Sequence, residues 1–186
     1  AYIAQAVVTP TVTSLITQAT TVKASSTPAA AIKVVIAVNA AETLSAITVV
    51  ATDSAATSFA PATDLAALAN DATSGIAIYN DAGSVSGSFD ATDAVVTLSG
   101  ASAFSSGSTT LTLASAGAAG TYYIVYRTAS AAVNGHSFVL TLPATGIDMS
   151  VADPTITAVA TSAITVDTTA PTVNANMTGP MNNSTS

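Results

Sequence analysis

The stretch "AIKVVIAVNA" (Ala31–Ala40), followed closely by "TLSAITVVATD" (Thr43–Asp53), decides the fold class. β-Branched and aliphatic residues dominate both runs, and their apolar residues recur largely with a period of two. This pattern is typical of strands with one buried face. The polar residues between the runs, at Ala40–Thr43, indicate a turn. We therefore predict two β-strands here.

Similar runs continue along the chain, and only "FAPATDLAALAND" (59–71) has helical character, as a single turn that Thr63 or Asp64 would cap. About nine short strands separated by Gly, Ser and Asp turns predict an all-β fold, an antiparallel β-sandwich of Ig-like or jelly-roll-like type. The further strand candidates are "LITQATTVKA" (15–24), "SGIAIYND" (74–81), "DAVVTLSG" (93–100), "STTLTLAS" (108–115), "GTYYIVYRTA" (120–129), "HSFVLTLPATGI" (136–147) and "PTITAVATSAITVD" (154–167).

The two ends of the chain differ from its middle. Residues 1–19 show an apolar alternation that Pro10 interrupts, and residues 170–186 are rich in Asn, Thr, Gly and Pro. We predict an N-terminal extension at 1–19, a sandwich at 20–169, and a linker or polar tail at 170–186.

Charged residues make up only 7% of the 186 residues, against about 25% in ordinary globular proteins. The net charge is −7, and Lys23, Lys33 and Arg127 are the only cations. This balance argues against a nucleic-acid or anionic-membrane partner. A Ser/Thr surface with so little charge also repels other copies weakly, so it suits a protein that packs against itself.

The chain has no cysteine, which removes disulfides and thiolate metal sites. No apolar run is long enough for a membrane-spanning helix, so we expect no membrane insertion. An alanine at position 1 and the Ser/Thr-rich composition lead us to expect a processed, secreted protein at the cell surface.

Several motifs together resemble the Ig-like β-sandwich modules of prokaryotic surface and secreted proteins. They are the strand end Tyr79-Asn-Asp81 before a Gly/Asp loop, "GTYYIVYRTA", "GHSFVLTLPATGI" and the ending "VDTTAPTV". The resemblance covers about residues 20–173 and implies a structural or adhesive role without an activity. The loop after Asp81 departs from the family pattern, because Gly83, Ser84, Val85 and Ser86 stand where further Asn or Asp residues are usual.

The stretch "YNDAGSVSGSFDATDAVV" (Tyr79–Val96) gathers Asp81, Asp90 and Asp93 between two predicted strands. Its spacing does not fit an EF-hand loop, which needs oxygen ligands at fixed positions and a final bidentate Glu. Pairing of the flanking strands in a hairpin would bring the three carboxylates together, and repulsion between them would favour a structural calcium ion. The alternative is that Asp90 and Asp93 shape turns while Asp81 faces solvent. No other cofactor is expected.

Catalytic patterns are missing from the sequence. His136, the only histidine, follows the turn signal Asn134-Gly135 and is expected to be an exposed turn residue, and no nucleophile elbow is present. Glu42 is the only glutamate, so a pair of glutamates for glycoside hydrolysis is lacking. We expect the protein not to be an enzyme. Three N-x-S/T sequons, at Asn176, Asn182 and Asn183, would place any glycan on the tail.

Two functions remain open. In the first, the chain is a self-assembling structural subunit of an extracellular filament or surface layer, and copies join when one donates the strand Ala1–Ile16 to the next. Ile3, Val8, Val12 and Ile16 would then fill pockets of the neighbour. In the second, the chain is a non-catalytic spacer or adhesion module of a multidomain surface protein, and its N-terminal segment folds into its own sheet.

Overall fold

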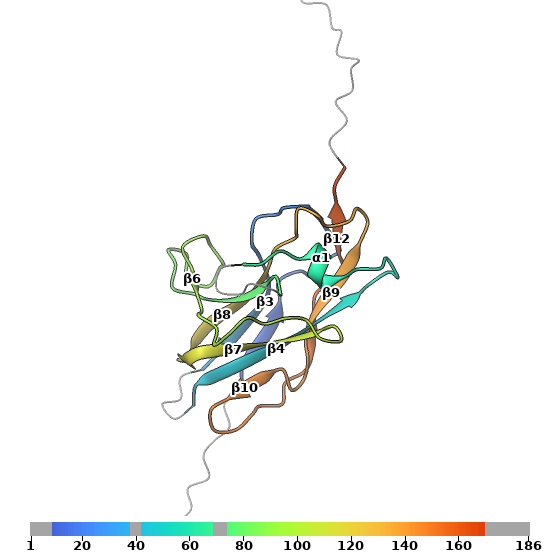
Figure 1. Ribbon diagram of the computed structural model, residues 1–186. Helices are drawn as coiled ribbons and strands as arrows, with labels where there is room; N and C mark the ends of the chain where they lie inside the picture. The colour runs from blue at the N-terminus through green and yellow to red at the C-terminus, as the bar shows by residue number, and fades with distance from the viewer. Residues whose placement is uncertain (1–8, 38–41, 69–73, 170–186) are drawn as a thin grey trace, which may run out of the picture.

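The computed structural model describes residues 9–37, 42–68 and 74–169, which form two β-sheets packed face to face (Figure 1). This confirms the predicted all-β sandwich. The helical turn α1 (Pro61–Asp64) lies where the sequence predicts it; its N-cap residue Ala60 has no capping side chain, and the Asp64 carboxylate accepts the N–H of Ala60 instead. No helix of the described ranges is long and apolar enough to span a membrane.

The first sheet has the strand order β1–β3–β8–β5–β6, and all of its neighbours pair antiparallel. Its strands are β1 (Thr11–Ser14), β3 (Ala29–Ile36), β8 (Gly120–Tyr126), β5 (Ile76–Asn80) and β6 (Ala94–Val95). The edge strand β1 lies within the range expected to be an N-terminal extension, and the structure places it in the sheet of its own chain.

The second sheet has the order β10–β4–β9–β12–β2, with β7 paired to β4 and β11 to β9. Its strands are β10 (Ile147–Met149), β4 (Leu44–Asp53), β9 (Ser137–Leu142), β12 (Ile164–Asp167), β2 (Thr20–Lys23), β7 (Ser108–Gly117) and β11 (Val159–Ala160). One pair departs from the antiparallel arrangement, because β2 runs parallel to β12. The cause is the N-terminal chain, which leaves the first sheet after β1 and reaches the edge of the second sheet without reversing.

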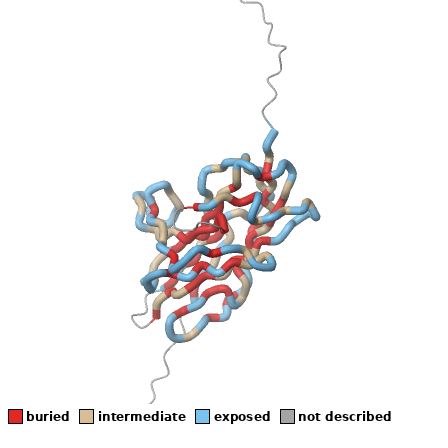
Figure 2. Tube along the Cα trace, viewed as in Figure 1, coloured by how far each residue is buried: buried red, intermediate tan, exposed pale blue. Residues whose placement is uncertain are grey.

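The core lies between the sheets, and the residues buried there come from strands of both sheets (Figure 2). Tyr122 and Tyr126 belong to this core and Tyr123 to a second cluster, as the alternation along β8 predicts. Each large aliphatic side chain buried this way contributes roughly 1.5–3 kcal/mol. The largest buried aliphatic side chains are Ile32, Leu44, Ile47, Ile76, Ile78, Leu111, Ile124, Leu140 and Leu142.

Two segments cross between the sheets and close the sides of the sandwich. Residues 94–99 cross on one side, where Val96 donates a backbone hydrogen bond to Ile78 and Leu98 is buried. Residues 15–19 cross on the other side, where the side chain of Leu15 remains 43% exposed. Solvent therefore reaches the apolar side chains more easily where residues 15–19 cross than where residues 94–99 cross.

Candidate functional site

The acidic loop, residues 81–93, connects β5 to β6 as the sequence predicts. Tyr79 lies opposite Val95 and Asn80 opposite Ala94 in an antiparallel pair. The hairpin brings all three predicted aspartates into one loop.

Each of these carboxylates accepts hydrogen bonds from the backbone of the loop itself. Asp81 Oδ2 accepts from the N–H of Gly87 (2.7 Å), and Asp93 accepts from the N–H groups of Gly83 (3.0 Å) and Asp90 (2.9 Å). Asp90 binds the N–H groups of Thr92 (2.7 Å) and Val85 (2.9 Å). Such bonds are what turn-shaping aspartates make.

The same bonds act on the charge of Asp90. The hydroxyl and N–H of Thr92, followed by the N–H of Val85, hold the pKa of the Asp90 carboxyl below its ordinary value. Asp90 therefore stays ionised without a cation beside it.

Gly83 lets the loop close around its carboxylates. A Cβ at this position would lie 2.6 Å from Asp93 Oδ1 and 2.8 Å from Asp90 Oδ1, closer than side-chain atoms approach. Across the ranges that the structure describes, no three acidic or histidine side chains are grouped so that they could hold a metal ion. A calcium ion and turn-shaping aspartates stay alternative predictions, and the backbone hydrogen bonds favour the second.

The acidic loop also covers the outer face of the first sheet, a role that the sequence analysis missed. Phe89 packs edge-on against Tyr79 (ring centroids 5.3 Å apart) and Tyr123 (5.8 Å), in a cluster that includes Leu68 and Val125. Phe89 is the only aromatic residue among the Gly, Ser and Asp residues of the loop, and that contrast is the signal that could have revealed its role.

The hydroxyl of Tyr123 is buried beneath this cover and has no hydrogen-bond partner within the described residues. Burial, with the negative charges of Asp81, Asp93 and Asp90, raises the pKa of Tyr123 to about 12. Tyr123 therefore stays neutral at any physiological pH.

The predicted donor segment divides into two parts. Val12 lies in β1 opposite Val34, and Ile16 packs against the core of its own chain. Ile3 and Val8 lie outside the described residues.

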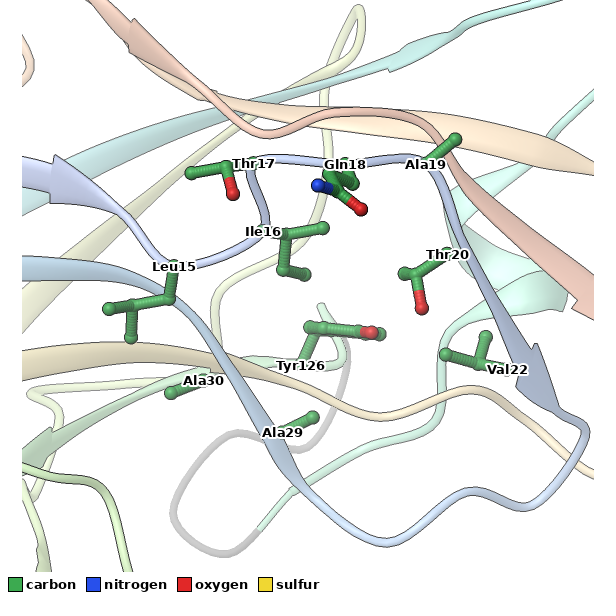
Figure 3. Close-up of a pocket in the computed structure, with 10 residues that line it drawn as sticks. All are labelled: Leu15, Ile16, Thr17, Gln18, Ala19, Thr20, Val22, Ala29, Ala30 and Tyr126. Carbon is green, nitrogen blue, oxygen red and sulfur yellow. The ribbon is translucent and has the colours of Figure 1, made fainter.

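Grooves flank β1 at both of its ends. One, of about 390 Å³, lies between Thr9–Val12 and Thr155–Val159. The other, of about 510 Å³, lies between residues 15–22, which are the crossing segment and the start of β2, and Ala29–Ala30, with Tyr126 at its base (Figure 3). We call the second one the Tyr126 groove. A groove thus lies near each end of the edge strand.

His136 is not the exposed turn residue that its sequence context predicts. Its Nδ1 atom lies 2.8 Å from Oδ2 of Asp64, and the two side chains are 16% and 0% exposed. Asp64 also accepts the N–H groups of Ala60 (2.8 Å) and Val133 (3.0 Å), so it ties α1 to the turn before β9. The prediction failed because the partner lies 72 residues away in sequence, where local patterns carry no information.

The cations of the chain serve its own fold. Lys33 Nζ donates to the carbonyl of Gly87 (2.8 Å), and the Arg127 guanidinium donates to that of Ala67 (2.8 Å). The Thr169 hydroxyl and N–H, and then the charge of Lys23, hold the pKa of Asp167 below its ordinary value. Two of the three cations therefore fasten segments over the first sheet.

The predicted glycosylation residues Asn176, Asn182 and Asn183 lie outside the described residues. No protein-family model matches the chain, and a search of curated proteins also finds no match.

Proposed function

We propose that this protein is a self-assembling structural subunit of an extracellular filament or surface layer, and that its N-terminal segment joins one copy to the next. The observation that carries the proposal is that the described chain enters and leaves the sandwich at opposite ends. A chain built this way can stack head to tail, which produces an open filament when the contact does not close into a ring.

The strand β9 links the two ends. Thr168 binds the side chain of Asn134, close to where β9 begins, through a hydrogen bond of 2.9 Å. At the other end of β9, Leu142 pairs with Val159, which shares a groove with Thr9–Val12. Figure 1 shows β12 at the top of the sandwich and β10, which follows β9, at the bottom. The first and last described residues are therefore separated by about the length of β9.

The surface chemistry also suits assembly. Because Lys33 and Arg127 bind carbonyls of their own chain, contacts between copies would depend on apolar and Ser/Thr surfaces rather than on ion pairs. Such contacts need no release of bound ions, so assembly would depend weakly on salt.

A second candidate is a spacer module in a longer surface protein. Chain ends at opposite poles also suit tandem modules, and the ending "VDTTAPTV" favours a junction. Here β1 stays in its own sheet and the free chain stays monomeric.

Electron microscopy of the purified chain and of a variant lacking residues 1–8 tests the proposal. We expect filaments or sheets from the intact chain and discrete particles from the variant. A variant lacking residues 170–186 is the matched control and should assemble normally. Discrete monomers from the intact chain would favour the spacer, and unchanged assembly without residues 1–8 would remove the joining role of the N-terminal segment.

A further inference from the structure

The Tyr126 groove holds a hydroxyl that makes no hydrogen bond within the described residues. Tyr126 as a whole is 1% exposed, but its hydroxyl oxygen, unlike that of Tyr123, is not fully buried and reaches the groove. Burial raises the pKa of Tyr126 to about 12, so the hydroxyl keeps its proton and can donate it. Figure 3 shows the ring at the base of the groove, with its hydroxyl end on the side of Thr20 and Val22. The hydroxyl is therefore free to donate a hydrogen bond to an acceptor on a molecule that lies in the groove.

The walls of the groove define the chemistry of that occupant. Among the described residues, no charged side chain lines the groove, and Leu15, Ile16 and Val22 present apolar surface to it. An ion bound here would lose its hydration without a compensating charge. An extended peptide with small apolar side chains fits better, because its carbonyls are acceptors and its side chains bury apolar area.

The chain itself contains such a peptide. Residues 1–8, "AYIAQAVV", have no charged side chain and place Ile3 and Val8 among small residues. Fully extended, eight residues span about 26–29 Å. The segment therefore reaches well beyond Thr9.

The position of the groove favours a second copy as the source of the peptide. Its residues Thr20 and Val22 pair with Ile164 and Val166, so the groove lies near the end at which Thr169 leaves the sandwich. Thr9 lies at the other end, beside Val159. In a head-to-tail stack, residues 1–8 of one copy start at the groove end of the next copy. A segment of the same chain would have to reverse at Pro10 and run back along β1.

We infer that the Tyr126 groove binds residues 1–8 of a neighbouring copy, with Ile3 in the groove and the Tyr126 hydroxyl donating to a main-chain carbonyl. The inference rests on the proposed assembly function and names its acceptor site. It also corrects the donor segment from Ala1–Ile16 to its first eight residues, because Val12 and Ile16 are held in their own chain.

The substitution Tyr126→Phe in the full chain tests the hydroxyl. Because the hydroxyl makes no hydrogen bond within the described part of the subunit, the thermal unfolding temperature of the separate subunit should stay the same. The concentration needed for assembly, measured by sedimentation, should increase about threefold to tenfold, since one hydrogen bond between copies is lost. A role within the subunit alone would instead lower the unfolding temperature and leave assembly unchanged.

Disulfide trapping tests the occupant. The chain has no cysteine, so Ile3→Cys and Ala29→Cys variants can be mixed and oxidised without background. We expect disulfide-linked pairs that contain one chain of each variant, and few when Thr112→Cys, exposed on β7 of the other sheet, replaces Ala29→Cys.

Filaments that still form but contain no disulfide-linked chains would overturn the groove assignment and leave the proposed function standing. A bond within one chain of an Ile3→Cys/Ala29→Cys double variant, without links between chains, would overturn the second copy as occupant. An intact chain that never assembles would overturn the proposed function itself.

Discussion

His136 and Asp64, 72 residues apart in sequence, are joined by a contact of 2.8 Å between Nδ1 and Oδ2. In an Asp64→Asn variant, an NH₂ group replaces one of the carboxylate oxygens. That group would face an N–H donor of Ala60, Val133 or His136 and could not accept its hydrogen bond. We expect a loss of roughly 1–3 kcal/mol in the free energy of unfolding at neutral pH, measured by urea denaturation. An unchanged midpoint would show that the contact does not hold α1 in place.

The pH dependence of this loss has a definite sign. Burial alone would raise the pKa of Asp64, but the N–H groups of Ala60 and Val133, with His136, outweigh it and lower the pKa. The stability that Asp64 contributes is therefore present above the unfolded aspartate pKa of about 4, and is lost as the pH falls through the lower folded value. The difference between wild type and Asp64→Asn should shrink below pH 4.

Asp148 is the matched control, because burial and the neighbouring charge of Asp153 raise its pKa. Asp148→Asn should stabilise the fold at neutral pH, and its effect should vanish on acidification. A destabilising effect at neutral pH would contradict this assignment.

Calcium should not change the stability of the acidic loop. Asp81, Asp90 and Asp93 already accept backbone hydrogen bonds, so we expect equal unfolding temperatures in excess EDTA and in millimolar calcium. Gly83→Ala should lower the unfolding temperature in both solutions, since its Cβ would meet two carboxylates. A clearly higher unfolding temperature in calcium than in EDTA would instead show that the acidic loop binds the ion that the sequence suggests.

Phe89 should be the residue through which the acidic loop stabilises the first sheet. Phe89→Ala uncovers Tyr79 and Tyr123 and should cost roughly 1–2 kcal/mol in the free energy of unfolding. Val85 stands 53% exposed in the same loop, so Val85→Ala is the control and should have no measurable effect. Equal effects of the two substitutions would mean that the loop does not cover the sheet.

The edge strand β1 should remain in its own sheet during assembly. Thr11 lies opposite Val35, and opposite residues of an antiparallel pair have Cα atoms about 4.5–5.5 Å apart, within disulfide range. A Thr11→Cys/Val35→Cys variant should therefore assemble equally well oxidised and reduced. Assembly only after reduction would show that β1 itself is exchanged. Thr48→Cys/Thr110→Cys, a bridge between β4 and β7, controls for the oxidant.

The sequence predicted the features that depend on local alternation. The hairpin between β5 and β6 follows from a period of two in its strands and from the turn residues between them. The parallel pair of β2 and β12 could not be predicted in this way, because its register joins Thr20 to Ile164 across most of the chain.

The candidate sites show the same limit. The three aspartates of the acidic loop lie close together in the sequence, so their presence in one hairpin loop could be predicted. The contact of His136 with Asp64, and the groove above Tyr126, depend on segments that only the tertiary fold brings together. Phe89 is visible in the sequence as the one aromatic residue of the acidic loop, but that pattern does not show which sheet its side chain covers.

The most direct measurement of the central claim is the sedimentation of the purified intact chain over a range of concentrations. The account predicts species far heavier than the 18.1 kDa subunit, growing with concentration, and a return to the subunit mass when residues 1–8 are removed. A single species of 18.1 kDa at every concentration would contradict it.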